Sequence, residues 1–108
     1  MSTSVFKGSI KTGTISARYR AAMTNPDPDL LVISYAPDGG PSVSFQDAAA
    51  PGGSAVVQID APARGVLEVL VVTGISTEHG RLTTACDGTT EDDEEIAGST
   101  RWIYAVVP

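Results

Sequence analysis

The stretch that decides the fold runs from residue 66 to residue 73 and reads Val-Leu-Glu-Val-Leu-Val-Val-Thr. β-Branched and aliphatic side chains dominate it, which is typical of a strand. Successive side chains of a strand point to opposite faces, so the segment presents two sets. The odd-numbered set is Leu67, Val69 and Val71, and the even-numbered set is Val66, Glu68, Leu70 and Val72. The sequence therefore predicts a strand that is apolar on both faces.

Similar short alternating segments occupy the rest of the chain and are separated by turns rich in glycine, proline and aspartate. In the first of them the alternation changes phase at Gly13, which predicts a β-bulge or a tight hairpin there. Seven or eight short strands with frequent turns are typical of an all-β antiparallel sandwich or jelly roll. The predicted strands are 6–10, 15–23, 30–36, 42–46, 55–60, 66–73, 81–86 and 101–107.

Length and composition set the scale of this fold. A chain of 108 residues fits one domain, so we expect a single β-sandwich over residues 1–108. Aromatic residues make up only 6% of the chain, so the core must consist mainly of Val, Ile, Leu and Ala. Cys86 is the only cysteine, which excludes an intramolecular disulfide.

The charge is unevenly distributed. Six of the 13 acidic residues lie between positions 87 and 95, and the remaining seven equal the seven basic residues in number. We expect an acidic loop here, with one short turn of helix near residues 92–97. The net charge of −6 argues against nucleic acid as a partner, because neutralising phosphates requires a basic surface. Four basic side chains near the start of the chain are predicted to be solvated: Lys7, Lys11, Arg18 and Arg20.

Two groups of oxygen-bearing side chains are candidate calcium ligands, since calcium takes six to eight oxygen ligands. Their spacing does not match an EF-hand. The calcium hypothesis gains support if the two groups lie at the same end of the sandwich. The alternatives are a solvated acidic loop and a plain turn built on asparagine, aspartate and proline. The candidate ligands are Asn25, Asp27 and Asp29 in the first group and Asp87, Glu91 and Asp92 in the second.

Trp102 and Tyr104 point to the same face of the last predicted strand. If that face were exposed, the two rings could form a stacking platform for carbohydrate. The low aromatic content of the chain favours a core position for Trp102 instead.

Catalytic chemistry has little support in this sequence. His79 is the only histidine, and a general base or metal ligand would need partners that the chain does not place near it. Cys86 is expected to be a buried thiol. Neither a nucleophile elbow, a zinc-protease motif, a paired-cysteine motif nor a phosphate-binding glycine loop is present. We therefore expect a protein that is not an enzyme and has no required cofactor.

No apolar segment approaches the length of a membrane span, so no membrane partner is expected. The first residues do not show a basic stretch followed by an apolar run. These features favour a cytoplasmic location, and a secreted mature form is the alternative.

Three predicted strands are apolar on both faces: residues 30–33, 66–72 and 101–107. One face of each strand in a two-layer sandwich should meet solvent, and monomers rarely expose large apolar patches. The leading hypothesis is a non-enzymatic binding or assembly module that forms a homo-oligomer through sheet faces. The second is a lectin-like carbohydrate-binding domain, with calcium as a possible aid. A hydrolytic enzyme is the third and least supported hypothesis.

Overall fold

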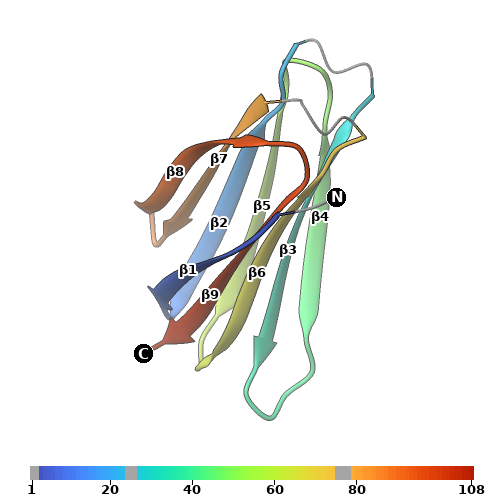
Figure 1. Cartoon of the computed structure of the whole chain (residues 1–108). Helices are drawn as coiled ribbons and strands as arrows, with labels where there is room; N and C mark the ends of the chain where they lie inside the picture. The colour runs from blue at the N-terminus through green and yellow to red at the C-terminus, as the bar shows by residue number, and fades with distance from the viewer. Residues whose placement is uncertain (1–2, 24–26, 75–78) are drawn as a thin grey trace.

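The computed structural model describes residues 3–23, 27–74 and 79–108. These residues form nine strands and no helix, arranged in two packed sheets (Figure 1). The strands are β1 (Thr3–Lys11), β2 (Gly13–Arg20), β3 (Asp29–Pro37), β4 (Val43–Ala49), β5 (Ser54–Ala61), β6 (Gly65–Val72), β7 (His79–Cys86), β8 (Thr89–Ala97) and β9 (Thr100–Val107). The all-β sandwich prediction is confirmed, with nine strands in place of seven or eight.

One sheet has five strands in the order β1-β9-β6-β3-β4, and the other has four in the order β5-β2-β7-β8. All neighbouring strands pair antiparallel except β1 and β9, which pair parallel. The segment from which the fold was predicted is β6, which lies at the centre of the larger sheet. Its two neighbours there are β3 and β9.

The core fills the space between the sheets. On β6 the odd-numbered side chains Leu67, Val69 and Val71 are fully buried, as the alternation predicts. Full burial of one such aliphatic side chain contributes about 1.5–3 kcal/mol relative to exposure. Trp102 and Tyr104 of β9 enter the same core, with 2% and 1% of their surface exposed.

The first strand departs from the predicted phase. Phe6 and Ile10 have the same parity, yet Phe6 is 68% exposed and Ile10 is 1% exposed. The cause is a register shift between Phe6 and Gly8 in the pairing of β1 with β9. An extra residue moves the following side chains to the opposite face. The bulge therefore lies between Phe6 and Gly8. The prediction of a bulge or tight hairpin at Gly13 is wrong, because the chain crosses there from one sheet to the other.

The bulge also reverses the prediction for Lys7. Its side chain points inward and is mostly covered, whereas Lys11, Arg18 and Arg20 are exposed as predicted. Sequence parity missed this because an irregular residue cannot be located from alternation when the strand holds only a few apolar residues.

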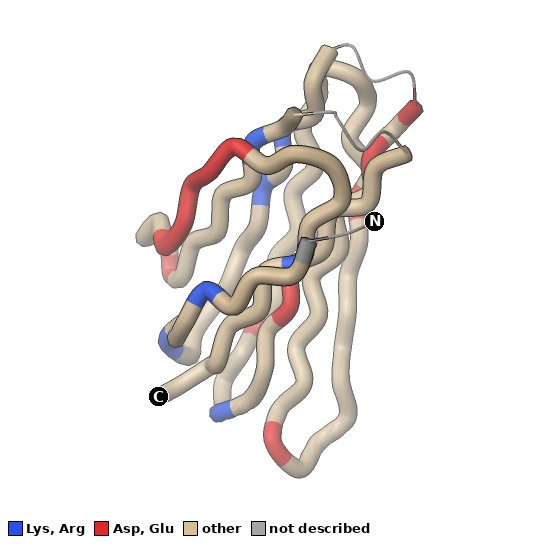
Figure 2. Tube along the Cα trace, viewed as in Figure 1, with Lys and Arg blue, Asp and Glu red and all other residues tan. Residues whose placement is uncertain are grey.

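The acidic segment is a strand and not a loop with a helical turn. Asp87 and Gly88 both have positive φ and form a two-residue hairpin turn between β7 and β8. Asp-Gly is a favoured pair for this turn, because both central residues adopt left-handed conformations. β8 then pairs with β7 along its length, and the acidic run follows this edge strand in Figure 2. Residues 92–97, predicted as a helical turn, belong to β8.

Within the described residues, no helix has the length and apolar character needed to cross a membrane.

Candidate functional site

The outer face of the five-stranded sheet carries apolar side chains that do not belong to the core. Side chains on this face point away from the four-stranded sheet, and most of them are apolar. They come from four adjacent strands, β1, β9, β6 and β3. The apolar set is Phe6, Leu30, Val32, Val66, Leu70, Val72, Ile103, Ala105 and Val107. We call this set the outer apolar face, and it agrees with the prediction of strands that are apolar on both sides.

One ion pair interrupts the outer apolar face. Glu68 of β6 and Arg101 of β9 lie on adjacent strands, with Arg101 Nε 3.0 Å from Glu68 Oε1. Both side chains are partly exposed. The pair is flanked by Leu70, which pairs with Arg101 across the sheet, and by Ile103, which pairs with Glu68. A single positive and a single negative charge thus lie side by side on a face that is mostly apolar.

Three of the four edge strands carry features that hinder further strand pairing: β8, β5 and β1. β8 carries five consecutive acidic residues at 91–95 along one edge. On β5 the backbone N–H of Val56 donates to the Asp47 carboxylate of β4, at 3.0 Å. On β1 the bulge at Gly8 and the inward-pointing Lys7 disrupt the regular edge. Charged side chains, bulges and inward-pointing charges are all known ways of blocking edge-to-edge association.

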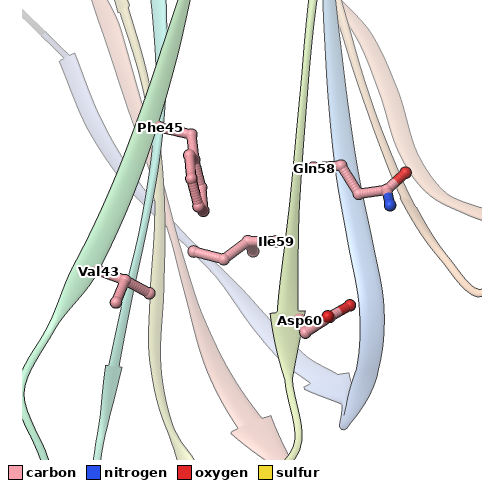
Figure 3. Close-up of a pocket in the computed structure, with 5 residues that line it drawn as sticks. All are labelled: Val43, Phe45, Gln58, Ile59 and Asp60. Atoms are coloured by element: carbon pink, nitrogen blue, oxygen red, sulfur yellow. The ribbon is translucent and has the colours of Figure 1, made fainter.

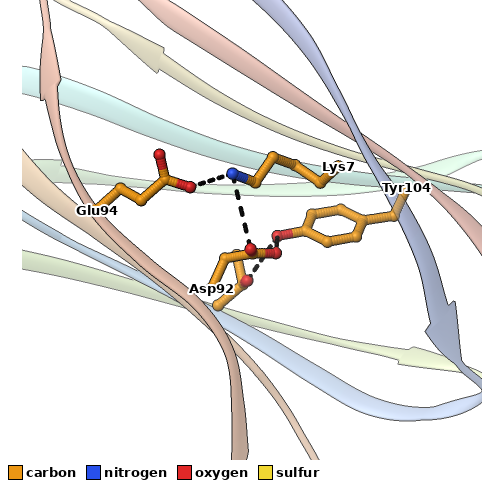
Figure 4. Close-up of polar contacts among 5 residues, drawn as sticks. Lys7, Asp92, Glu94 and Tyr104 are labelled. Atoms are coloured by element: carbon orange, nitrogen blue, oxygen red, sulfur yellow. Dashed lines mark hydrogen bonds and ion pairs between the residues drawn. The ribbon is translucent and has the colours of Figure 1, made fainter.

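Lys7 closes the sandwich between the edge strands β1 and β8 (Figure 4). Its Nζ bonds to the Glu94 carboxylate and lies 3.6 Å from Asp92 Oδ1. The same ammonium is 4.4 Å from the centre of the Trp102 ring. A cation above an indole face is stabilised by the ring quadrupole. This arrangement joins the two sheets at a side where the apolar core would otherwise meet water.

Tyr104 extends the polar cluster into the core. Its hydroxyl donates to Asp92 Oδ2 at 2.6 Å and lies 2.7 Å from the hydroxyl of Thr84. Burial, followed by the hydrogen bond to Asp92, raises the pKa of Tyr104 well above its usual value. The phenol therefore stays protonated at neutral pH and has no basic form to offer to a substrate.

The predicted carbohydrate platform is not at the surface. Trp102 and Tyr104 share one face of β9 as expected, but that face is the inner one. Trp102 lies beneath Lys7, and Tyr104 is held by Thr84 and Asp92. Neither ring presents a free face against which a sugar could stack, so the expectation of core packing for Trp102 is confirmed.

Asp29 and Asp87, one from each group of predicted calcium ligands, lie at opposite ends of β2. Asp29 accepts a hydrogen bond from the Tyr19 hydroxyl near the end of that strand, at 2.9 Å. Asp87 accepts one from the Thr14 backbone N–H near its start, also at 2.9 Å. Five residues of extended strand span about 16 Å, so Asp29 and Asp87 cannot share one cation. Asn25 lies outside the described residues.

The remaining predicted ligands are either exposed or bonded to other side chains. Asp27 and Glu91 are exposed, and Asp92 is engaged with Lys7 and Tyr104. Across the residues that the structure describes, no cluster of three or more histidine, cysteine or carboxylate side chains is suited to hold a metal ion. The acidic residues have another explanation, because in β8 they alternate between the inner cluster around Lys7 and the outer surface.

His79 and Cys86 stand at the two ends of β7. Seven residues of strand separate them by about 23 Å, so they cannot act as a catalytic pair. Cys86 is buried, and its thiol donates to the Lys11 carbonyl at 3.3 Å. Burial, followed by the negative charge of Asp87, raises the pKa of the Cys86 thiol. A thiol held in its neutral form is a poor nucleophile.

A pocket of about 280 Å³ lies between the edge strands β4 and β5. The side chains of Val43, Phe45 and Ile59 point into it, whereas those of Gln58 and Asp60 point away (Figure 3). The inward side chains are apolar and offer no acid, base or nucleophile. These apolar side chains suit the pocket to an apolar group.

The chain matches no protein-family profile, no curated protein and no solved structure.

Proposed function

We propose that this protein is a non-enzymatic assembly module that forms a homodimer through the outer apolar face of its five-stranded sheet. The observation that carries the proposal is the apolar surface spread over four strands with one ion pair inside it. Contiguous exposed apolar surface of this kind marks an interaction site. The partner proposed is a second copy of the same chain.

Charge complementarity supports a second copy as the partner. When two copies pack face to face about a two-fold axis at right angles to the line joining Glu68 and Arg101, each Glu68 faces the partner's Arg101. The four charges then alternate in sign. A two-fold interface is built from one patch that is complementary to itself, and a paired positive and negative charge meets that condition.

The protected edges favour packing between faces over continuation of a sheet. Two copies that met through β8 would place like charges opposite each other, which is destabilising. β5 has one of its backbone donors occupied by Asp47. Packing of two sheet faces needs no free backbone groups and uses the apolar side chains directly.

The area of the outer apolar face sets the expected affinity of the dimer. Four strands of about eight residues cover about 500 Å² of flat area. Stable pairs bury about 800 Å² on each partner. The dimer is therefore expected to be reversible and to dissociate on dilution within the micromolar range.

The test compares two exposed valines on opposite sheets. Val66 is 48% exposed on the outer apolar face, and Val56 is 56% exposed on the outer face of the four-stranded sheet. Sedimentation equilibrium of the wild-type chain should give a concentration-dependent dimer. Val66→Lys should raise the dissociation constant of the dimer by about tenfold or more, because it buries an unpaired ammonium in the interface. Val56→Lys should leave it unchanged.

A wild-type chain that remains monomeric at millimolar concentration would rule out the proposed dimer. Equal effects of the two lysine variants on the dissociation constant would show that the interface is not on the outer apolar face. Circular dichroism of each variant establishes that the fold is retained, since both valines are at the surface.

A further inference from the structure

The outer face of the four-stranded sheet carries a cluster of arginines that folding does not account for. Arg18 and Arg20 extend from β2, and Arg81 extends from β7 beside them. Together with Thr83 and Asp93 they line a surface pocket of about 300 Å³. Figure 2 shows the basic positions of β2 and β7 grouped next to the acidic run of β8.

The register of the sheet places two of these charges directly against each other. Arg20 pairs with Arg81 across β2 and β7. Opposed residues have Cβ atoms about 4.5–5.5 Å apart, and like charges in that position destabilise a sheet. Asp93 offsets part of this repulsion through its ion pair with Arg81, and a bound anion would offset the rest.

Only one of the three guanidinium groups is neutralised. Arg81 Nε lies 2.7 Å from Asp93 Oδ1, and the Thr83 hydroxyl donates to the same oxygen at 3.1 Å. This hydrogen bond with Arg81 holds the pKa of Asp93 below its usual value, so the carboxylate is charged at neutral pH. Neither Arg18 nor Arg20 forms an ion pair with any residue that the structure describes.

We infer that Arg18, Arg20 and Arg81 form a binding site for a doubly charged tetrahedral oxyanion, either free phosphate or sulfate or the terminal phosphate of a small ester. A guanidinium presents a planar fork of donors that matches such an anion with two parallel hydrogen bonds. The two unpaired arginines supply two positive charges, and Asp93 holds the third guanidinium in place.

The surroundings of the site favour a small anion over a long one. Asp93 and Glu95 of β8 lie on the same outer face, and Glu95 pairs in register with Arg81. The carboxylate of Glu95 is 3.8 Å from His79 Nδ1. A polyanion such as nucleic acid would extend over this acidic strand and be repelled, because its affinity depends on many basic contacts. A single phosphate group occupies only the arginine cluster.

The experiment is an NMR titration of the full chain at constant ionic strength. Inorganic phosphate, sulfate and phenyl phosphate are each added, with acetate as the singly charged control. We expect saturable shifts of the Arg18, Arg20 and Arg81 side-chain N–H signals at millimolar phosphate, sulfate and phenyl phosphate, and much weaker binding of acetate. Comparable affinities for the three dianions would identify the oxyanion itself as the ligand, whereas tighter binding of phenyl phosphate would identify an ester.

Arg20→Gln and Arg18→Gln should each weaken binding by about tenfold, which corresponds to losing a charge-assisted hydrogen bond. Arg64→Gln is the matched control, because Arg64 is an exposed arginine on the turn between β5 and β6. Phenyl phosphate should also bind more weakly below pH 6, where it loses its second charge, while sulfate should not.

The site would be disproved if no dianion gave saturable shifts at these side chains, or if the Arg18 and Arg20 variants bound as tightly as the Arg64 variant. The wild-type titration provides this answer even if a variant fails to fold. It is also independent of self-association, which is proposed for the opposite sheet.

Discussion

At the scale of single residues, Lys7 and Tyr104 show how a chain poor in aromatics uses polar groups to complete its core. Lys7 covers the Trp102 ring and bonds to the acids of β8, and Tyr104 reaches Asp92 from within. Buried polar groups are tolerated when their hydrogen bonds are made. The cluster therefore supports the fold and leaves no unpaired group for chemistry.

Tyr104 provides a pH-dependent test of this cluster. Its pKa in the folded protein is raised above the unfolded value of about 10. The stabilisation is thus complete below about pH 10 and is lost as the pH rises towards the folded pKa. In an alkaline titration of the wild-type chain, the absorbance change due to ionisation of Tyr104 is the part that is missing in Tyr104→Phe. This part should occur at the same pH as the cooperative unfolding measured by circular dichroism. Ionisation of Tyr104 in a chain that remains folded would contradict the geometry described.

At the scale of elements, the acidic strand β8 has a role that its composition alone did not reveal. It forms an edge of the four-stranded sheet, and its outward-facing acids include Asp93 and Glu95. A regular exposed edge is a template for pairing with another chain, and charge prevents this. The same residues that were predicted to form a solvated loop therefore protect an edge.

Neutralising three exposed acids of β8 should remove the charge that protects this edge. In the triple variant Glu91→Gln, Asp93→Asn and Glu95→Gln, we expect faster aggregation into β-rich assemblies at neutral pH, since the remaining strand pairs readily with its copies. Thioflavin T fluorescence measures the rate. The control is Asp27→Asn with Asp38→Asn and Asp60→Asn, which removes the same charge from exposed positions elsewhere. Equal rates in the two triple variants would show that net charge, and not position, prevents aggregation.

The predictability of these elements depended on how regular each segment is. The alternation of Leu67, Val69 and Val71 identified β6 and its buried face correctly. β1 was misjudged because one extra residue before Gly8 inverts its faces, and side-chain parity carries no sign of that. β8 was missed because strand propensity is low for acidic residues, although the Asp87-Gly88 turn signal was present in the sequence.

The candidate surfaces also differ in how far the sequence predicts them. The outer apolar face was foreseen from two-sided strands, since each strand carries the evidence in its own sequence. The Arg18–Arg20–Arg81 cluster was not, because it depends on the pairing of β2 with β7, which are far apart in the chain. Trp102 and Tyr104 were predicted to share a face, but only the packing of two sheets decides which face is buried.

At the scale of the whole molecule, the two outer faces differ in character. One is apolar with a single ion pair, and the other carries arginines beside acidic residues. The proposed dimer would cover the first face and leave the second exposed on both sides of the assembly. Two anion sites would then point away from each other.

A charge exchange tests the arrangement of the dimer. Glu68→Arg or Arg101→Glu alone should weaken dimerisation, because each places like charges together both within a copy and across the interface. The double variant that exchanges the two residues should restore it, since the alternation of signs returns. Sedimentation equilibrium on the three variants measures this. Failure of the double variant to recover affinity would argue against a two-fold axis beside this ion pair.

The parallel pairing of β1 with β9 bears on how the protein is made. The described first and last strands are neighbours, and β9 lies between β1 and β6 in the larger sheet. During synthesis this sheet therefore lacks the strand that joins β1 to β6 until β9 has left the ribosome. Until then β1 has no partner and β6 has an open side. Contacts between such distant segments form slowly, on a scale of milliseconds to seconds for all-β domains, so this fold is completed only after translation of its final strand.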